Sequence, residues 1–341
     1  MSMRINRCIS AAAIILLIAV ISGCSKPVAE SVSSPPAVEG GYVIVKVAAA
    51  KGDYPYNTGV TPFQAGEKAA KELKEKLGGA TPHAVVIAES FEGKDAKKQA
   101  LSGVCSVFDR KKVYGFATYG SFGQDGCSDN DTIRLMAIAG DGISVAAALE
   151  RDMGAYGLTI EDNGPLLKER LRTAGSKIAA KLPKTDQSKL MIVIPDAHSP
   201  KNAYVVEGVH DQFGKDFPIT GGSPNKNPGQ TFLYYQGQMF NDSAIAFMLS
   251  GDFKVSVAGR KAQDNAKVIS TASEAFKEAK DSLAPEPFAA IAFNCAGRKG
   301  KLDKLEDELE AIQSQLGTDV PLFGTYCAGE IGPADVSDKQ E

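Results

Sequence analysis

The chain has 341 residues, a formal net charge of −3, and 43% hydrophobic with 23% charged residues, an ordinary globular composition that allows a sizeable core. At about 150 residues per domain, this length suits two domains. Lysine and arginine are spread along the chain, which argues against a nucleic-acid-binding face, and three histidines leave few candidates for histidine catalysis.

The N-terminus has the pattern of a bacterial lipoprotein signal peptide, which we predict over residues 1–23. Arg4 and Arg7 precede an uncharged apolar run, Ile9–Ile21, and the following "ISGC" resembles a lipobox whose cysteine, Cys24, is lipidated and becomes the new N-terminus. The run is too short to span a bilayer, which takes about 20 apolar residues. The alternatives are an ordinary signal peptide and an uncleaved anchor, each with a chance cysteine.

A tether is predicted between this segment and the first domain. Residues 24–40 are rich in serine, proline, alanine and glycine, so they lack the apolar content of a core and are expected to be extended. Ser25 is not the aspartate typical of retention in the inner membrane, which favours the outer membrane. We therefore expect a protein of the cell envelope that faces the periplasm or the cell surface and contacts the membrane through lipid on Cys24.

From Tyr42 onward, short apolar runs alternate with amphipathic segments. This pattern predicts an α/β fold of mixed β-sheets with flanking helices, built from repeated β-α-β units with inserted β-hairpins. The first round is strand Tyr42–Ala50, helix Pro62–Leu77, strand His83–Ser90, helix Asp95–Asp109 and strand Lys112–Gly120. Thr61 is the expected N-cap of the first helix and Gly78 its stop. Strands on either side of Asp141-Gly142 are expected to form a hairpin.

The same order of elements then returns twice. The second round is helix Asn163–Leu182, strand Leu190–Ala197, helix Asn202–Gly214 and strand Phe217–Ser223, followed by strands Thr231–Phe240, Ala244–Gly251 and Lys254–Gly259. The third round is helix Asp264–Leu283, strand Phe288–Gly297, helix Lys301–Leu316 and strand Pro321–Gly332. We place domains at 41–240 and 241–335, with a polar tail at 336–341.

Three strands in equivalent places end in small residues. They are "YGFATYGSFG" (Tyr114–Gly123), "FPITGGSPN" (Phe217–Asn225) and "LFGTYCAGEIG" (Leu322–Gly332). Glycine-rich turns after buried strands let backbone N–H groups and small side chains line a cavity. The three ends therefore predict a shared pocket, and the alternative is that the glycines only make the turns.

The C-terminal third of the chain resembles FIST domains. "AFNCAGRKGKL" (Ala292–Leu302), followed about 20 residues later by "PLFGTYCAGEIGP" (Pro321–Pro333), is similar to the family's C-terminal signature. "PITGGSPNKNPGQTFLYYQGQMFNDSAIAFMLSG" is similar to the end of the family's N-terminal half, and "VYGFATYGSFGQDG" to its first glycine-rich strand end. The resemblance covers most of Tyr42–Pro333 and is strongest in the last 45 residues.

The resemblance implies a sensory module that binds a small molecule such as an amino acid. Two departures limit this expectation. The C-terminal half is abbreviated, with one helix between Val257 and Phe288 where relatives usually carry more. No kinase, cyclase or methyl-acceptor segment is attached, so signalling by this chain carries over less directly than ligand binding.

The expected ligand-binding residues come from the three strand ends and the family signature. They are Tyr119, Gly120, Ser121, Gly221, Gly222, Ser223, Cys295, Arg298, Tyr326, Gly329 and Glu330. Arg298, near a helix N-terminus, suits a carboxylate, and Glu330 suits an ammonium group, so together they would hold the two ends of an amino acid. The rivals are a surface arginine and an Arg298–Glu330 ion pair without a ligand.

Four cysteines remain after signal-peptide removal and lipidation: Cys105, Cys127, Cys295 and Cys327. An even number in an exported protein permits disulfides. Cys295 and Cys327 each end a strand, with one helix between them, so their strands are expected to be neighbours in a parallel sheet. A disulfide, two buried or pocket-lining thiols, and a catalytic thiol all stay open for this pair.

The remaining chemistry-bearing patterns are weak. "PDAHSP" (Pro195–Pro200) places Asp196 and His198 at a strand end, with His210 further on, but metal-ligand spacing is absent, so a turn leading into a helix is expected. No nucleophile elbow, Walker loop or dinucleotide fingerprint occurs, and we predict neither a metal nor a cofactor. The alternatives to a ligand-binding module are a thiol enzyme using Cys295 or Cys327 and a module that docks on another envelope protein.

Overall fold

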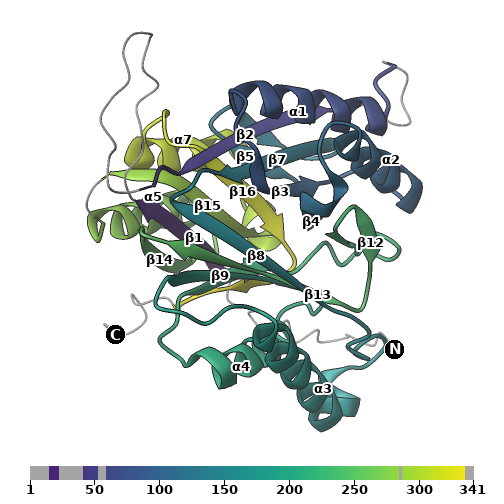
Figure 1. Cartoon of the computed structure of the whole chain (residues 1–341). Coiled ribbons are helices and arrows are strands. Elements are labelled where there is room, and N and C mark those ends of the chain that lie inside the picture. Colours follow the sequence, from purple (N-terminus) through teal and green to yellow (C-terminus); the bar gives the residue numbers. More distant parts are fainter. Residues whose placement is uncertain (1–14, 23–40, 53–58, 284–285, 335–341) are drawn as a thin grey trace, which may run out of the picture.

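The computed structural model describes residues 15–22, 41–52, 59–283 and 286–334. They form three β-sheets, each covered by helices on its outer side, with the inner faces of the sheets packed against one another (Figure 1). The predicted α/β fold with mixed sheets and flanking helices is confirmed. Among the described residues, no helix is long and apolar enough to span a bilayer.

The first sheet carries the first round of the chain. Its order is β12 (Gln238–Phe240), β11 (Leu233–Tyr235), β4 (Val113–Ala117), β3 (Pro82–Glu89), β7 (Thr132–Ala139) and β2 (Ile44–Lys51). Helices α1 (Pro62–Lys76) and α2 (Lys94–Cys105) cover its outer face, and a 3-10 turn, Arg110–Lys112, leads into β4. Thr61 caps α1 as predicted, because its hydroxyl accepts from the Gln64 N–H in a capping box.

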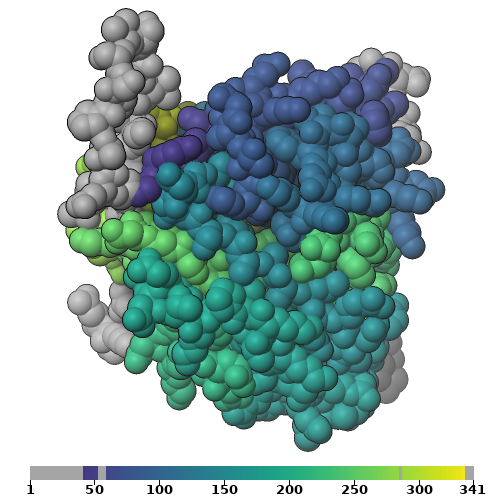
Figure 2. Space-filling model, viewed as in Figure 1, coloured from purple at the N-terminus to yellow at the C-terminus, as the bar shows by residue number. Residues whose placement is uncertain are grey.

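The second sheet has the order β17 (Glu330–Ile331), β10 (Ile219–Gly222), β9 (Ser188–Pro195), β13 (Ala244–Gly251) and β8 (Ile143–Glu150). Helices α3 (Ile160–Ala180) and α4 (Asn202–Phe213) cover it. In the space-filling view this teal lobe faces the blue lobe of the first sheet across the middle of the molecule (Figure 2).

The third sheet has the order β14 (Lys254–Lys261), β1 (Ile15–Ser22), β15 (Pro287–Cys295), β16 (Leu322–Cys327), β5 (Ser121–Gly123) and β6 (Gly126–Ser128). Helices α5 (Asn265–Asp281), α6 (Ala296–Lys299) and α7 (Leu305–Leu316) lie beside it. Strands β15 and β16 are parallel neighbours with Cys295 opposite Cys327, which confirms the predicted strand pairing.

Aromatic and branched side chains from all three sheets form one shared core. Phe116 of the first sheet stacks on Phe293 of the third, with ring centroids 6.3 Å apart, and Tyr114 meets Phe247 of the second sheet edge to face at 5.4 Å. Each sheet also has a separate cluster against its own helices. The sheets are therefore stabilised on both faces, as mixed sheets with crossover helices require.

The hairpin predicted around Asp141-Gly142 is wrong. Strand β7 pairs with β2 and β3 in the first sheet, whereas β8 pairs with β13 in the second. The Asp-Gly turn carries the chain from one sheet to the next, because β7 is buried along its whole length between two strands of its own sheet. The short hairpins that the fold does contain are β5–β6 and β11–β12.

Part of the predicted signal peptide lies in the third sheet. Residues 15–22 form β1 between β14 and β15, whereas residues 1–14, the lipobox Cys24, the tether 24–40 and the polar tail 336–341 lie outside the described residues. Processing after residue 23 stays a prediction, and it would remove β1 from the mature sheet.

Candidate functional site

The three glycine-rich strand ends meet, and main-chain hydrogen bonds join them. Ser223 N–H donates to Gly329 O at 2.7 Å, and Tyr119 N–H donates to Tyr326 O at 2.9 Å. Asn225 N–H donates to Ala117 O at 2.9 Å, which ties the second end to the first. Residues far apart in sequence are therefore brought together as predicted, in what we name the strand-end junction (residues 117–121, 221–225 and 326–330).

The glycines of the junction serve close backbone packing. A Cβ atom on Gly222 would lie 2.6 Å from Cys327 Sγ, and one on Gly329 would lie 2.6 Å from Ser199 N. Gly120 has φ of +117°, and a Cβ there would lie 2.4 Å from Ser128 O. Main-chain atoms and a thiol fill this space, so the junction is closely packed. The glycines therefore permit turns and close backbone contacts, which was the alternative, and do not line a shared pocket.

Protein groups bind the Arg298 guanidinium. The guanidinium is fully buried and donates to Glu308 Oε1 at 3.0 Å, Thr271 Oγ1 at 3.1 Å and Val268 O at 2.7 Å. The partner is thus Glu308, ten residues on, and neither a ligand carboxylate nor Glu330. The expectation that Arg298 and Glu330 hold the two ends of an amino acid does not fit this geometry.

The remaining residues expected in the pocket take part in packing of the junction. Tyr326 is buried against Phe122, with ring centroids 5.2 Å apart, and Ser121 Oγ accepts from Arg134 Nε at 3.3 Å. Gly221 pairs with Ile331 across β10 and β17. Tyr119 is the exception, because its hydroxyl donates to Asn227 Oδ1 at 3.3 Å in the wall of a cavity described below.

The carboxyl of Glu330 lies near two cysteine thiols, and burial keeps all three groups protonated more strongly than usual. Burial raises the pKa of Glu330 to about 8 and of the Cys295 thiol to about 11, and burial also holds the pKa of Cys327 well above its usual value. Glu330 Oε1 is buried and has no hydrogen-bond partner among the described residues. The thiols are free and protonated at neutral pH, so they lack the thiolate that a nucleophile needs.

The raised pKa of Glu330 predicts a pH-dependent loss of stability. Between its ordinary value of 4.5 and its folded value of about 8, the unfolded chain has lost a proton that the folded chain keeps, so stability falls as pH rises through this window. Glu330→Gln stays uncharged, so we expect the variant to gain roughly 4 kcal/mol over the wild type at pH 8 and little at pH 4.5.

Urea unfolding of both proteins from pH 4.5 to pH 8 measures this difference. Comparison with wild type isolates Glu330 from other groups that titrate in the same range. Glu310→Gln, which changes an exposed carboxylate on α7, is the matched control and should show no pH-dependent gain. Parallel stability curves for wild type and Glu330→Gln would contradict a buried, protonated carboxyl.

A cavity of about 460 Å³ opens beside the junction, at the end of β9. Four loops far apart in sequence form it: 155–157 before α3, 196–201 before α4, 226–232 before β11, and 241–242 before β13. The side chains with chemical groups that line this Asp196 cavity are Tyr156, Asp196, His198, Lys201, Lys226, Asn227, Asn241 and Asp242. Ser223 joins cavity and junction, because its hydroxyl donates to Ala197 O at 2.7 Å.

The Asp196 cavity carries charges of both signs. Asp196 Oδ2 accepts from the Asp242 N–H at 2.7 Å, which leaves Oδ1 for a ligand. Burial raises the pKa of Asp196 to about 6, so the carboxyl is mostly ionised at pH 7. Lys201 and Lys226 line the same cavity, and Lys201 Nζ donates to Leu158 O at 3.0 Å.

His198 is held neutral next to Asp196. Burial, together with the charges of Lys201 and Lys226, lowers the pKa of His198 to about 4. The ring Nε2 lies 3.8 Å from Asp196 Oδ1 and has no hydrogen-bond partner among the described residues. An uncharged imidazole nitrogen without a partner can donate to or accept from a polar ligand.

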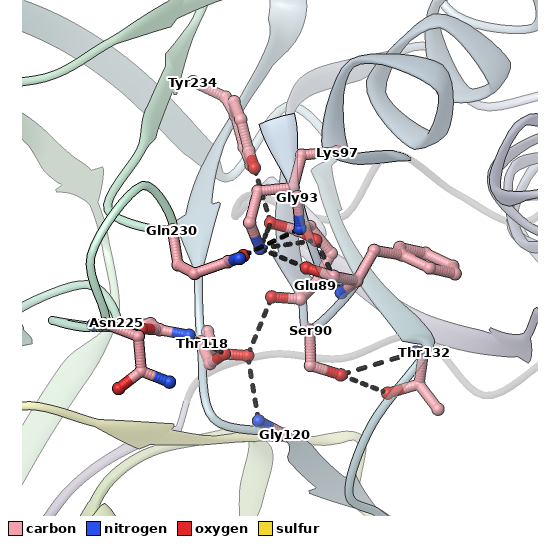
Figure 3. Close-up of polar contacts among 12 residues, drawn as sticks. Glu89, Ser90, Gly93, Lys97, Thr118, Gly120, Thr132, Asn225, Gln230 and Tyr234 are labelled. Atoms are coloured by element: carbon pink, nitrogen blue, oxygen red, sulfur yellow. Dashed lines mark hydrogen bonds and ion pairs between the residues drawn. The ribbon is translucent and has the colours of Figure 1, made fainter. Parts of the chain in front are cut away.

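A buried polar cluster fixes the 226–232 wall of the cavity (Figure 3). Gln230 Oε1 accepts from Gly93 N–H at 3.0 Å, and Asn225 Nδ2 donates to Thr118 O at 3.3 Å. Behind them, Lys97 and Glu89 form an ion pair of 3.2 Å that is almost inaccessible to solvent. A part-buried bond at Gln230 and a buried bond at Asn225 therefore hold this wall and its start in place.

The sequence pattern around Asp196 and His198 predicts only a turn. The turn does lead into α4, and the same residues line the cavity. Two strong signals pointed elsewhere, namely the glycines and the family signature. Among the described residues, His, Cys, Asp and Glu side chains do not group as metal ligands would.

Comparison with known proteins places the chain in a family. The FIST N domain family matches residues 84–274, and the FIST C domain family matches residues 254–333. No curated protein matches the sequence. Among solved structures, thiamine-monophosphate kinase from Stenotrophomonas maltophilia K279a is 10% identical over 66% of this chain and 84% of that chain, and the TM-score of 0.24 is too low to indicate a shared fold. The chain belongs to the FIST family, whose domains are sensory domains of signal transduction proteins.

Proposed function

We propose that this protein is a bacterial envelope lipoprotein, anchored through Cys24, whose FIST module senses a small polar molecule by binding it in the Asp196 cavity. The observation that carries the proposal is a cavity of about 460 Å³ with carboxylate, ammonium and neutral imidazole groups on its walls. Its volume lies within the roughly 300–1,000 Å³ of small-molecule sites. The signal-peptide pattern at residues 1–24 supports the anchored location.

The charges favour a ligand that carries both an amine and a carboxylate. Asp196 Oδ1 is the acceptor for an ammonium group, and Lys201 and Lys226 are the cations for a carboxylate. Neutral His198 adds one uncharged polar group to the same cavity. Amino acids have these two groups on one small molecule, so they are the first ligands to test.

A panel of amino acids, plain carboxylates and plain amines tests the proposal by calorimetry and thermal unfolding of the processed chain. A ligand at 100 times its Kd should add about 2.7 kcal/mol of stability. Asp196→Asn should weaken ligands with an ammonium group tenfold or more and spare plain carboxylates, because the charge-assisted hydrogen bond is lost. Lys201→Gln should weaken ligands with a carboxylate instead.

The pH dependence of ligand affinity gives an independent check of the site. Affinity for ammonium ligands should fall as pH drops from 7 to 5, since Asp196 gains a proton near pH 6. Asp211→Asn, an exposed carboxylate on α4 paired with Arg172, is the matched control. Absence of binding across the panel, or equal weakening of all ligands by both cavity variants, would count against the proposed site.

The thiol-enzyme alternative receives no support from this geometry. Cys327 is fully buried, and the pKa of Cys295 is raised to about 11. Cys295 Sγ accepts from the Gly297 N–H at 3.2 Å as a helix cap. We therefore assign Cys327 to packing of the junction and Cys295 to the N-cap of α6.

A further inference from the structure

Strand β1 fills an internal position of the third sheet. It pairs antiparallel with β14 over eight residue pairs and with β15 over seven (Figure 1). Strand β14 is the last strand of the sheet and has β1 as its neighbour there. Residues 15–22 lie within the predicted signal peptide, so processing after residue 23 would remove the strand that joins β14 to the rest of the sheet.

Contacts independent of β1 hold β14 in place. Arg260 pairs with Glu278 and lies 3.9 Å from Glu274, both on α5. Phe253, just before β14, packs edge to face on Phe288 with ring centroids 6.3 Å apart.

The preceding strand also restrains β14. Only Asp252 and Phe253 link β14 to β13, and β13 is paired on both sides with β8 and β9. Moving β14 onto β15 would require a shift of about 4.8 Å, one strand spacing. A shift of that size would break the contacts of Arg260 with α5, so we expect the position between β14 and β15 to stay open in the processed chain.

The open position selects an apolar, extended segment. Residues Ala289–Phe293 of β15 are all apolar and almost fully buried, and Ala258 of β14 is buried as well. Val255 and Val257 pack against the shared core. Unpaired N–H and C=O groups of two strands in such surroundings require partners, and an inserted strand supplies them on both sides.

The tether of the processed chain does not suit this position. Residues 24–40 carry Lys26, Glu30 and Glu39 and three prolines. Proline removes a ladder N–H and is found at sheet edges, and the charges would be buried. The same holds for the tether of a second copy, so neither fills the gap by this route.

We infer that, in the processed protein, the gap between β14 and β15 binds an apolar strand of about eight residues from another envelope polypeptide, antiparallel to both, in the place of β1. This inference rests on the processing step of the proposed function and not on the Asp196 cavity. In the precursor, the strand of residues 15–22 takes this place and pairs with both neighbours.

Two measurements are needed, one for the processing and one for the binding of a strand. Intact mass of the protein from the membrane fraction reports whether residues 1–23 are removed. Hydrogen exchange of the chain from residue 24, with Cys24→Ser to avoid lipidation, is then followed with and without a synthetic peptide of residues 15–22 flanked by lysines. The peptide should slow exchange in β14 and β15 at least tenfold.

A second peptide and the full chain serve as controls for binding in the gap. The same peptide with Ala19→Pro should have no effect, because proline breaks the ladder. The full chain of 341 residues, with β1 in place, should not respond to either peptide. Equal protection of β14 and β15 with and without peptide, or equal effects of both peptides, would overturn the inference. A mass that includes residues 1–23 would instead overturn the processing.

Discussion

Arg298→Met is expected to destabilise the protein by about 3–5 kcal/mol, because it leaves Glu308 buried without its cation. Both side chains are at most 1% exposed, and their ion pair is 3.0 Å long. Glu308 also accepts from Asn294 Nδ2 at 2.8 Å, so the pair links β15, α6 and α7. Urea unfolding of wild type and variant at pH 7 measures the loss.

Arg172→Met is the matched control for this change. Arg172 pairs with Asp211 at 2.7 Å, but the two side chains are 49% and 37% exposed, so the loss should stay within about 1 kcal/mol. If both variants lose the same free energy, the Arg298–Glu308 pair is better solvated than its burial indicates. The large expected loss also makes Arg298→Ala a poor probe of ligand binding, since unfolding would hide any effect on affinity.

Lys97→Met is expected to cost about 3–5 kcal/mol for the same physical reason. Lys97 Nζ donates to Glu89 Oε1 at 3.2 Å and to Phe91 O at 2.5 Å, and Tyr234 donates to the same carboxylate (Figure 3). Without the lysine, the charge of Glu89 remains buried under α2. The 226–232 wall should loosen as well, so ligand affinity is expected to fall.

A double-mutant cycle separates the ion pair from packing. Glu89→Gln combined with Lys97→Met removes both charges, so the double variant should be more stable than Lys97→Met alone. Lys71→Met, in an exposed pair with Glu67 on α1, serves as the control and should change stability by less than about 1 kcal/mol. Strictly additive losses in the cycle would show that Lys97 and Glu89 do not interact.

Local patterns predicted the elements well. Thr61 and Pro62 mark the start of α1, and the single helical crossover between Cys295 and Cys327 correctly predicted parallel neighbours. Such features depend on residues close in sequence or on a general handedness rule. These elements form as predicted because tertiary packing does not oppose them.

Features that depend on long-range packing were not readable from the sequence. The turn at Asp141-Gly142 has hairpin chemistry, yet β7 and β8 belong to different sheets. Arg298 lies in the segment that resembles the family signature, but its guanidinium forms an ion pair with Glu308 on α7. The Asp196 cavity needs loops from residues 155–157, 196–201, 226–232 and 241–242 to converge, and no local pattern gives their distances.

The sheets exchange strands across the family boundary. Strands β5 and β6, from the first round of the chain, pair with β16 at the other end of the sequence, and β17 joins the second sheet through β10. Neither family segment can therefore complete its own sheets when the chain is divided. We therefore expect the three sheets to unfold together, so that loss of β17 would lower the melting temperature of the whole module.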